Sequence, residues 1–491
     1  MSKFLTILIC FLGAVFRPGN LLAQAQQNPW SLEACISYAL THNSEVRQSE
    51  LDLEVSQATR AQTKAALLPT GRASAAHGYN FGRSINPFTN QYVEEQIQTS
   101  NLGLNASLLL FNGLQLQNSI KQTTLGVKAS QQDLEQAANT VSLNVALAYL
   151  AILQNEELLE IATRQLATSQ SQLARADKLV AAGVMAQSTL ADLQVQAGND
   201  ELEKVNAANN LSTAKLTLMQ LMNLPAVSDF QVQKLSVNSL ATNSYDKTAA
   251  AVYEIAQKTQ PSIIGADLRV KSSYRAVQAA RGALLPSLSL VGAMGTAYSS
   301  AVPTSRFVAD GTGFTRQDVA SETDFVMVNG NRQPVISTRQ VPNGSMQDFL
   351  YFDQLRFNLG KYVGLNLSIP ILNGWQTRNR ISNAQIARKR AEFAADNARI
   401  QLRQNIELAY TNLISAQTRL ETARKQAEAT EVAYKAAQKR FENGSVHFVD
   451  LNLAKTNYDR AQLNEVRAKY DYVFRKKILD FYQDKPLTLQ E

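Results

Sequence analysis

Apolar residues occupy every second position in two separate stretches of the chain. In the first stretch they are Leu102, Leu104, Ala106, Leu108 and Leu110. In the second stretch they are Val363, Leu365, Leu367, Ile369 and Ile371. The residues between them are mostly small or polar. A period of two with one apolar face predicts a β-strand whose two faces meet different surroundings.

Weaker alternation predicts a partner for each of these strands. Ala73, Ala75, Tyr79 and Phe81 mark one partner, and Leu288 and Leu290 begin the other. About eleven residues at ~3.3 Å each, tilted by ~45°, cover roughly 25 Å, which is the apolar height of an outer-membrane barrel. A sandwich strand that faces a water-soluble core would show the same alternation, so the pattern leaves both interpretations open.

Heptad spacing predicts very long helices after each strand pair. In the first half of the chain, apolar residues recur every seven positions, with one interval of four between two such runs. This spacing indicates a coiled-coil seam with a stutter. A helix over residues 114–182 would be about 100 Å long at 1.5 Å per residue. Gly183 and Gly444 each follow such a helix and permit a left-handed cap, after which the chain turns back. The seam residues are Ile120, Val127, Leu134, Val141, Ala148, Ile152, Leu159, Leu166, Leu173 and Val180, and in the second half Ala395, Leu402, Ala409, Leu413, Leu420, Ala427, Tyr434 and Phe441.

The two halves of the chain are copies of one unit. The segment 65–69 recurs at 282–286, an offset of 217, and the segment 110–113 recurs at 371–374, an offset of 261. The second copy therefore carries a 44-residue insertion between these two segments. We predict a mainly α protein with a small transmembrane β part, built as an internal two-fold repeat of helix, strand, strand and long helical hairpin.

The repeat predicts the domain organisation. A charged start at Lys3, an apolar run and the small residues Ala23 and Ala25 predict a signal peptide over residues 1–25. The first repeat is predicted over 26–225, with strands at about 70–83 and 101–111, a hairpin over 114–222 and its tip at 183. A linker over 226–250 follows. The second repeat is predicted over 251–491, with strands at about 287–299 and 356–372, a long extracellular loop at about 300–355, and a hairpin over 375–484 with its tip at 444.

Composition excludes several classes of protein. The formal net charge of +7 is too small to indicate nucleic-acid binding. Of the two cysteines, Cys10 lies in the predicted signal, so Cys35 has no disulfide partner in the mature chain. The three histidines are far apart in sequence, and no motif for metal binding, phosphate binding or nucleophilic catalysis is present. We expect no enzymatic activity, no cofactor and no metal site.

The doubled repeat, both Asn-Gly junctions after a strand, both Ala-Tyr pairs and both glycine tips resemble the TolC-type outer-membrane efflux and secretion channels. The resemblance runs from Trp30 to Pro486. It implies a homotrimer in the outer membrane of a Gram-negative bacterium. Each protomer would give four strands to one twelve-stranded barrel that continues into a periplasmic α-helical tunnel. It also implies a passive exit duct that works with a periplasmic membrane-fusion adaptor and an inner-membrane pump, in an efflux or type I secretion system.

The resemblance assigns roles to three groups of residues. Hairpin ends of the family contact the adaptor, whereas without the resemblance they are ordinary solvated turns. Asp450 matches an acidic position that lines the closed periplasmic entrance, although Leu453 replaces the second acid of the family. A plain acidic residue at a helix start is the other interpretation of Asp450. The expected tip residues are Gly183, Val184, Met185, Ser188, Arg440, Gly444, Ser445 and Val446, and the expected lipid-facing residues are Leu104, Leu108, Leu110, Val363, Leu365, Leu367, Ile369 and Ile371.

Two alternatives to a channel remain open from the sequence. A periplasmic coiled-coil adaptor or scaffold would also present helical hairpins, but it needs a small β-sandwich instead of lipid-facing strands. An adhesin role for the segment 300–355 is possible as an addition to the channel.

Overall fold

The computed structural model describes residues 29–85, 90–93, 96–226, 229–234, 245–443 and 445–485. The predicted signal peptide and Gly444 lie outside the described residues. The chain forms two compact units. Unit 1 contains residues up to 53, 130–265 and 395 onward, and unit 2 contains residues 54–129 and 266–394.

Eight helices of the described residues form four pairs of equal length, which confirms the internal repeat. Members of a pair are separated by the offsets found in the sequence, 217 for the first two pairs and 261 for the other two. The pairs are α1 (Leu32–His42) with α6 (Ala249–Thr259), α2 (Ser44–Ala65) with α7 (Pro261–Gly282), α3 (Gln115–Ala181) with α9 (Gln376–Glu442), and α4 (Gln187–Leu221) with α10 (Phe448–Tyr482).

Local chemistry fixes where the shorter helices begin and break. The Ser31 hydroxyl accepts a hydrogen bond from the backbone N–H of Ala34 at 3.2 Å and caps α1. Asn43 is extended between α1 and α2, and its side chain accepts from the N–H of Glu45 at 2.8 Å. In the second repeat Pro261 is the first residue of α7. The backbone N–H that proline lacks would have no hydrogen-bond partner within the helix at this position, so the helix loses no hydrogen bond.

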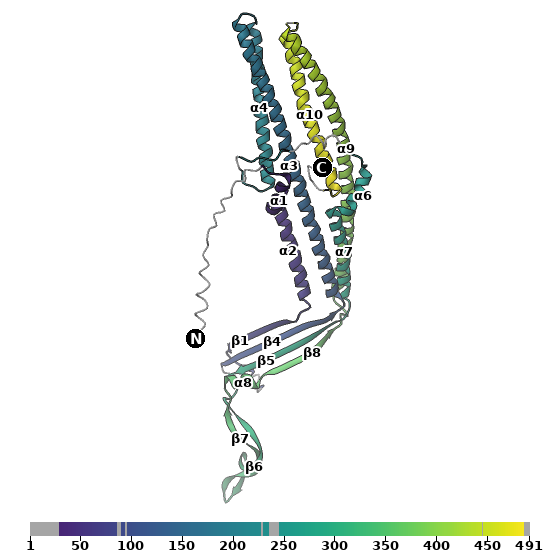
Figure 1. Cartoon of the computed structure of the whole chain (residues 1–491). Coiled ribbons are helices and arrows are strands. Elements are labelled where there is room, and N and C mark those ends of the chain that lie inside the picture. Colours follow the sequence, from purple (N-terminus) through teal and green to yellow (C-terminus); the bar gives the residue numbers. More distant parts are fainter. Residues whose placement is uncertain are drawn as a thin grey trace. The chain divides into compact units, whose positions relative to one another are not determined.

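In unit 1, α3 and α4 form one hairpin, and α9 and α10 form the other (Figure 1). Their shared core includes Val141, Ile152, Leu402 and Leu413, which are heptad positions of both copies. The buried Tyr149 of α3 donates its hydroxyl hydrogen bond to the carbonyl of Gln233 at 2.7 Å. The predicted coiled-coil seam is therefore confirmed as the packed side of these helices.

The segment between the repeats packs into the core of unit 1. Phe230 and Val232 are buried, and Val232 forms a parallel bridge with Trp30. Helix α6 already begins at Ala249. The described residues of the predicted inter-repeat linker over 226–250 are therefore packed against the helices of unit 1 by apolar side chains, and α6 begins just before its predicted end.

Among the described helices, α3 alone contains a window long and apolar enough to cross a membrane. Length and composition do not distinguish such a helix from a core helix. Val145, Leu150 and Leu153 of α3 are buried in the core of unit 1, so packing covers part of its apolar surface.

Unit 2 contains a four-stranded antiparallel sheet of order β1-β4-β5-β8, with the strands side by side in one layer (Figure 1). The predicted strand bounds need three corrections. The first strand ends at 80 instead of 83, the second begins at 97, and the fourth is confined to 360–368. Helix α8 (Tyr351–Phe357) occupies the start of the predicted fourth strand, and Pro370 cannot donate a ladder hydrogen bond at its end. The strands are β1 (Thr70–Asn80), β4 (Ile97–Asn112), β5 (Ser287–Ser299) and β8 (Gly360–Ser368).

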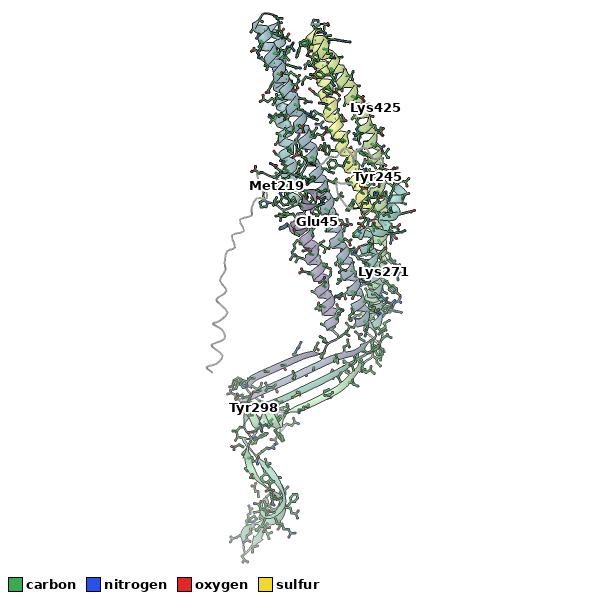
Figure 2. The ribbon with its side chains drawn as sticks, in the orientation of Figure 1. Glu45, Met219, Tyr245, Lys271, Tyr298 and Lys425 are labelled. Atoms are coloured by element: carbon green, nitrogen blue, oxygen red, sulfur yellow. The ribbon has the colours of Figure 1, made fainter. Side chains whose placement is uncertain are left out.

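Helix α8 packs against the end of β5. The ring of Tyr298 on β5 lies 4.6 Å from the ring of Tyr351, and Figure 2 labels Tyr298 at this point. The Gln354 side chain accepts a hydrogen bond from the N–H of Ser299 at 3.1 Å. In the first repeat the described residues of the corresponding connection form the two-residue strands β2 (Ser84–Ile85) and β3 (Tyr92–Val93).

The insertion forms a β-ribbon, so the long connection predicted over 300–355 is mostly a regular pair of strands instead of an irregular loop. Strands β6 (Ser305–Val328) and β7 (Asn331–Asp348) pair with each other and span the 44 residues of the insertion. Asn329 and Gly330 both have positive φ, 52° and 85°, and make the tight turn. Gly311 and Gly313 lie in a bulge of β6. Turn-forming residues therefore serve a bulge and a hairpin end, where the sequence alone suggested an irregular loop.

Candidate functional site

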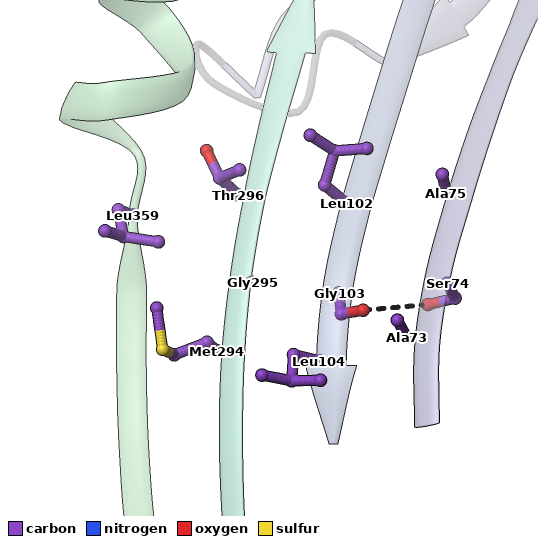
Figure 3. A pocket seen from close by; sticks show the side chains of 10 residues that line it. All are labelled: Ala73, Ser74, Ala75, Leu102, Gly103, Leu104, Met294, Gly295, Thr296 and Leu359. Carbon is purple, nitrogen blue, oxygen red and sulfur yellow. Dashed lines mark hydrogen bonds between the residues drawn. The ribbon is translucent and has the colours of Figure 1, made fainter. Parts of the chain in front are cut away.

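One face of the sheet collects the alternating apolar residues of all four strands. Strand register places Ala75 opposite Leu102, which in turn lies opposite Thr296, and Leu290 pairs with both Leu108 and Leu365. Side chains on one face of a strand are two residues apart, so these rows share a face. Figure 3 shows part of it as a shallow open depression lined by Ala73, Leu102, Leu104 and Met294.

Side chains of this apolar face are exposed. Val363 is 78% exposed and Leu365 is 65% exposed. Across the described residues the four strands form a single sheet, and β2–β3 and β6–β7 form separate two-stranded sheets. The sandwich interpretation is therefore wrong. A bare apolar face of this size is typical of a surface that meets lipid or another protein.

The opposite face carries mostly small and polar side chains. Gly103 of β4 lies opposite Gly295 of β5, and Ser74 donates a hydrogen bond to the carbonyl of Gly103 at 3.5 Å (Figure 3). Asn105 and Asn366 lie on the same face by strand alternation. A sheet that is apolar on one face and small and polar on the other can separate lipid from a water-filled channel.

The structure brings together most of the predicted lipid-facing residues. Leu104, Leu108, Val363, Leu365 and Leu367 lie in register on the apolar face. Three others do not belong to the ladder. Leu110 is the extra residue of a bulge between Leu109 and Phe111. Ile369 and Ile371 follow the end of β8 and are exposed, since Pro370 stops the pairing.

The end of the first hairpin is a tight turn. Gly183 has φ of +75°, and the N–H of Val184 donates to the carbonyl of Leu179 at 2.9 Å, which closes the last turn of α3. Val184 and Ser188 are exposed, whereas Met185 is half-buried. Ala186 stands at the N-cap of α4 and offers no side-chain hydrogen bond.

The end of the second hairpin is described on both sides of Gly444. The N–H of Ser445 donates to the carbonyl of Arg440 at 2.8 Å, and both side chains are exposed. Asp450 lies in the first turn of α10 and is also exposed. A carboxylate at this position interacts favourably with the helix N-terminus.

A groove lies between the ends of the two hairpins. Its wall includes three predicted tip residues, Val184, Met185 and Val446, together with Phe441 and Phe448. Arg175 and Glu442 add opposite charges to the same wall. Gly183, Ser188, Arg440 and Ser445 are absent from the lining. The structure therefore brings the apolar tip residues together and leaves these four exposed outside the groove.

A buried ionic cluster links the two hairpins, and the sequence analysis did not identify it. The ammonium of Lys455 on α10 lies 3.0 Å from Asp200 on α4 and 2.7 Å from Asp459. Ser169 of α3 and Gln196 of α4 also donate hydrogen bonds to Asp200. Lys455 is only 3% exposed and Asp200 is 8% exposed.

The charges of this cluster depend on one another. Burial acts to lower the pKa of Lys455, but Asp459 and Asp200 outweigh it, so the pKa of Lys455 lies above its ordinary value. The spacing of Lys455 and Asp459 at i, i+4 could have indicated an ion pair, but nothing local in the sequence points to Asp200, 255 residues away.

None of these groups resembles a catalytic or metal centre. In the described ranges no set of three His, Cys, Asp or Glu residues is placed to hold a metal ion. The features that remain are a two-faced sheet and the ends of two long hairpins.

Residues 35–224 and 360–479 match the family model described as "Outer membrane efflux protein", and these segments make up more than half of the chain. The chain belongs to the outer membrane efflux protein family. The match omits residues 225–359, which contain α6, α7, β5 and the β6–β7 ribbon. The chain is thus an outer-membrane exit channel of a Gram-negative bacterium, and the features described above are parts of its wall and of its hairpins.

Individual relatives agree with this assignment. The outer membrane efflux protein BepC of Brucella suis is 21% identical over 462 residues, which are 94% of this chain and 86% of the relative. TolC of Escherichia coli is 22% identical over 97% of this chain and 85% of its own length. The toluene efflux pump outer membrane protein TtgF of Pseudomonas putida is 25% identical over 53% of each chain. The CmeC outer membrane channel of Campylobacter jejuni has the same fold, with a TM-score of 0.70, 17% identity and coverage of 93% of this chain and 87% of that one.

Proposed function

We propose that three copies of the chain close a twelve-stranded barrel in the outer membrane and form a passive exit duct. The observation that carries this proposal is the single-layer sheet, which has one exposed apolar face and two free edges, β1 and β8. A free edge cannot face lipid, because its backbone N–H and C=O groups would lack hydrogen-bond partners. Four strands are too few for a closed barrel, so copies of the chain supply the rest.

The helical hairpins would extend this duct into the periplasm and meet the rest of an export machine. The apolar groove at the hairpin ends, with Val184, Met185 and Val446, supports contact with a periplasmic membrane-fusion adaptor. The exposed Gly183, Ser188, Arg440 and Ser445 would form the polar rim of this contact, together with Gly444. The name of the relative TtgF includes an efflux pump, which is consistent with an inner-membrane pump as the source of energy.

Asp450 is proposed to line the periplasmic entrance. In a trimer three exposed Asp450 side chains would form a ring, and carboxylate rings favour cations. Leu453 is exposed one turn further on. We therefore propose a ring with one carboxylate per protomer. The duct itself would catalyse no reaction, bind no cofactor and bind no nucleic acid.

Charging each face of β8 in turn tests the proposal. Leu365→Lys places a charge on the apolar face, and Asn366→Lys places it on the opposite face at the neighbouring residue. A lysine that faces lipid near the bilayer midplane costs about 2–4 kcal/mol, whereas one that faces water costs little. We expect Leu365→Lys to abolish outer-membrane trimers, measured by membrane fractionation and native mass, and Asn366→Lys to retain them. Equal assembly of both variants would contradict a lipid-facing barrel.

A further inference from the structure

We propose that β8 of one copy pairs antiparallel with β1 of the next copy in one defined register. In this register Val363 lies opposite Tyr79 of the partner subunit, and Gly364 lies opposite Gly78 of the partner subunit. The proposal rests on the trimer proposed above and adds the residue pairs that close it.

The first step is that pairing within one repeat predicts pairing within the other. In the first repeat Thr70 of β1 pairs with Ser107 of β4. The offset of 217 takes Thr70 to Ser287 of β5, and the offset of 261 takes Ser107 to Ser368 of β8. Ser287 and Ser368 pair in the structure. The sheet therefore follows the sequence repeat without a shift of register.

The second step is that the contact between the two repeats is a template for the contact between two copies. Strand β4 corresponds to β8, and β5 corresponds to β1. The pair Leu102–Thr296 therefore becomes Val363 with Tyr79 of the partner subunit. By the same shift Gly103–Gly295 becomes Gly364 with Gly78 of the partner subunit.

The third step is the identity of the residues that meet. The pair Gly103–Gly295, between β4 and β5, maps onto a second pair of glycines, Gly364 with Gly78 of the partner subunit. A slip of two residues would instead place Gly364 opposite Ala76 of the partner subunit or Asn80 of the partner subunit. A Cβ atom on Gly364 would collide with the ring of Tyr362, which therefore lies over this glycine and is still 60% exposed. The ring would shield the two facing glycines, as aromatic residues do for glycine in other sheets.

The fourth step is that the register keeps the two faces of the sheet separate. Leu367 would lie opposite Ala75 of the partner subunit, and both belong to the apolar rows of their own strands. A slip by one residue would move the apolar row of β8 to the polar face of β1. In lipid such a slip is strongly unfavourable, so the apolar face selects among possible registers.

The template holds for the strands but not for the helix ends beside them. Within the chain, a Cβ on Gly282 of α7 would lie within 3.0 Å of the Gly113 carbonyl. The residue that corresponds to Gly282 in the first repeat is Ala65, which has a Cβ. Around Gly374, which corresponds to Gly113, the described chain leaves open space. We therefore expect a wider contact between copies here than between repeats.

Paired cysteines test the register. In a background with Cys10→Ala and Cys35→Ala, one variant carries Val363→Cys with Tyr79→Cys, and its matched control carries Val363→Cys with His77→Cys. Cβ atoms of directly opposite residues are about 4.5–5.5 Å apart and diagonal ones are about 7–8 Å apart, so oxidation should link only the opposite pair efficiently. We expect covalent trimers on non-reducing gels for the first variant, at least tenfold more than for the control.

Three results would overturn this register: preferential linkage of the His77 control, equal linkage of both variants, or intact trimers in which neither variant links. If the first variant does not assemble, Leu367→Cys with Ala75→Cys tests the same register four residues along the strand. The native mass of each preparation before oxidation separates the two proposals. Trimers with the wrong linkage refute the register alone, whereas monomers in the Cys-free background refute the trimer as well.

Discussion

At the scale of single residues, the repeat offers matched sites with different surroundings. Gly113 and Gly374 occupy equivalent positions before a long helix and have positive φ, 63° and 59°. At Gly113 a Cβ would lie within 3.0 Å of the Gly282 carbonyl and of Leu285, whereas at Gly374 nothing in the chain is within 4 Å. The backbone conformation is thus shared, but the close approach is not.

We expect Gly113→Ala to destabilise the protein much more than Gly374→Ala. Alanine at Gly374 adds mainly the left-handed strain of about 1–2 kcal/mol. Alanine at Gly113 adds a steric collision with backbone atoms that cannot rotate away. Thermal unfolding of the two purified variants measures the difference. Equal melting temperatures would show that the close approach between Gly113 and Gly282 is absent.

Cys35 illustrates how burial controls reactivity. Burial, and secondarily the charge of Glu33, raises the pKa of the Cys35 thiol to about 12. The thiolate is the reactive form, so we expect almost no alkylation by iodoacetamide at pH 8 until the protein is denatured. Mass spectrometry before and after denaturation checks this. Rapid alkylation of the folded protein would contradict the burial of Cys35 in α1.

The same shift predicts a pH dependence of stability. The folded state disfavours the thiolate, so the unfolded chain loses this proton first as the pH rises. Stability should therefore be unaffected by Cys35 below pH 9.0 and should fall as the pH rises from 9.0 toward about 12. Denaturant unfolding at pH 8 and pH 10.5, compared with Cys35→Ala, isolates this contribution. An identical pH dependence in both proteins would refute it.

At the scale of elements, the ionic cluster between α4 and α10 holds the two hairpins together. Lys455→Met leaves Asp200 and Asp459 buried without their cation, which typically costs about 3–5 kcal/mol. Lys435 is a control, because it pairs with Glu431 on the surface, where loss of a pair costs about 0–1 kcal/mol. We expect a large loss of stability for Lys455→Met and almost none for Lys435→Met in thermal unfolding. Adding Asp200→Asn and Asp459→Asn to Lys455→Met should restore part of the loss.

The sequence predicted most elements because their signals are local and occur twice. Heptad positions such as Val141 and Leu402 identify the long helices from nearby residues. The β6–β7 ribbon was missed because its glycines and prolines, Gly311 among them, also occur in loops, and only long-range pairing shows that they lie in a bulge. The contact of Lys455 with Asp200 joins different repeats, so no pattern within one segment could reveal it.

At the scale of the whole molecule, one repeated unit supplies both a wall and a contact surface. The repeat makes the strands of the two halves equivalent, so that the same pairing rule can operate within a chain and between chains. An insertion is tolerated where it leaves the register between the strands of the sheet unchanged. The β6–β7 ribbon interrupts the second repeat between β5 and β8, yet β5 and β8 keep the register of β1 and β4.

The hairpin ends allow a test of export that is independent of barrel assembly. Val184 is 75% exposed beside Gly183, and Val195 is 64% exposed on α4 of the same hairpin. Aspartate at Val184 would place a charge among the apolar side chains of the groove where we propose that the adaptor binds, whereas aspartate at Val195 adds the same charge away from the turn. We expect Val184→Asp to reduce export at least tenfold with normal trimers in the outer membrane, and Val195→Asp to export normally. Since both variants keep the sheet of unit 2, full export by Val184→Asp would refute adaptor contact at this turn and leave the proposed barrel unaffected.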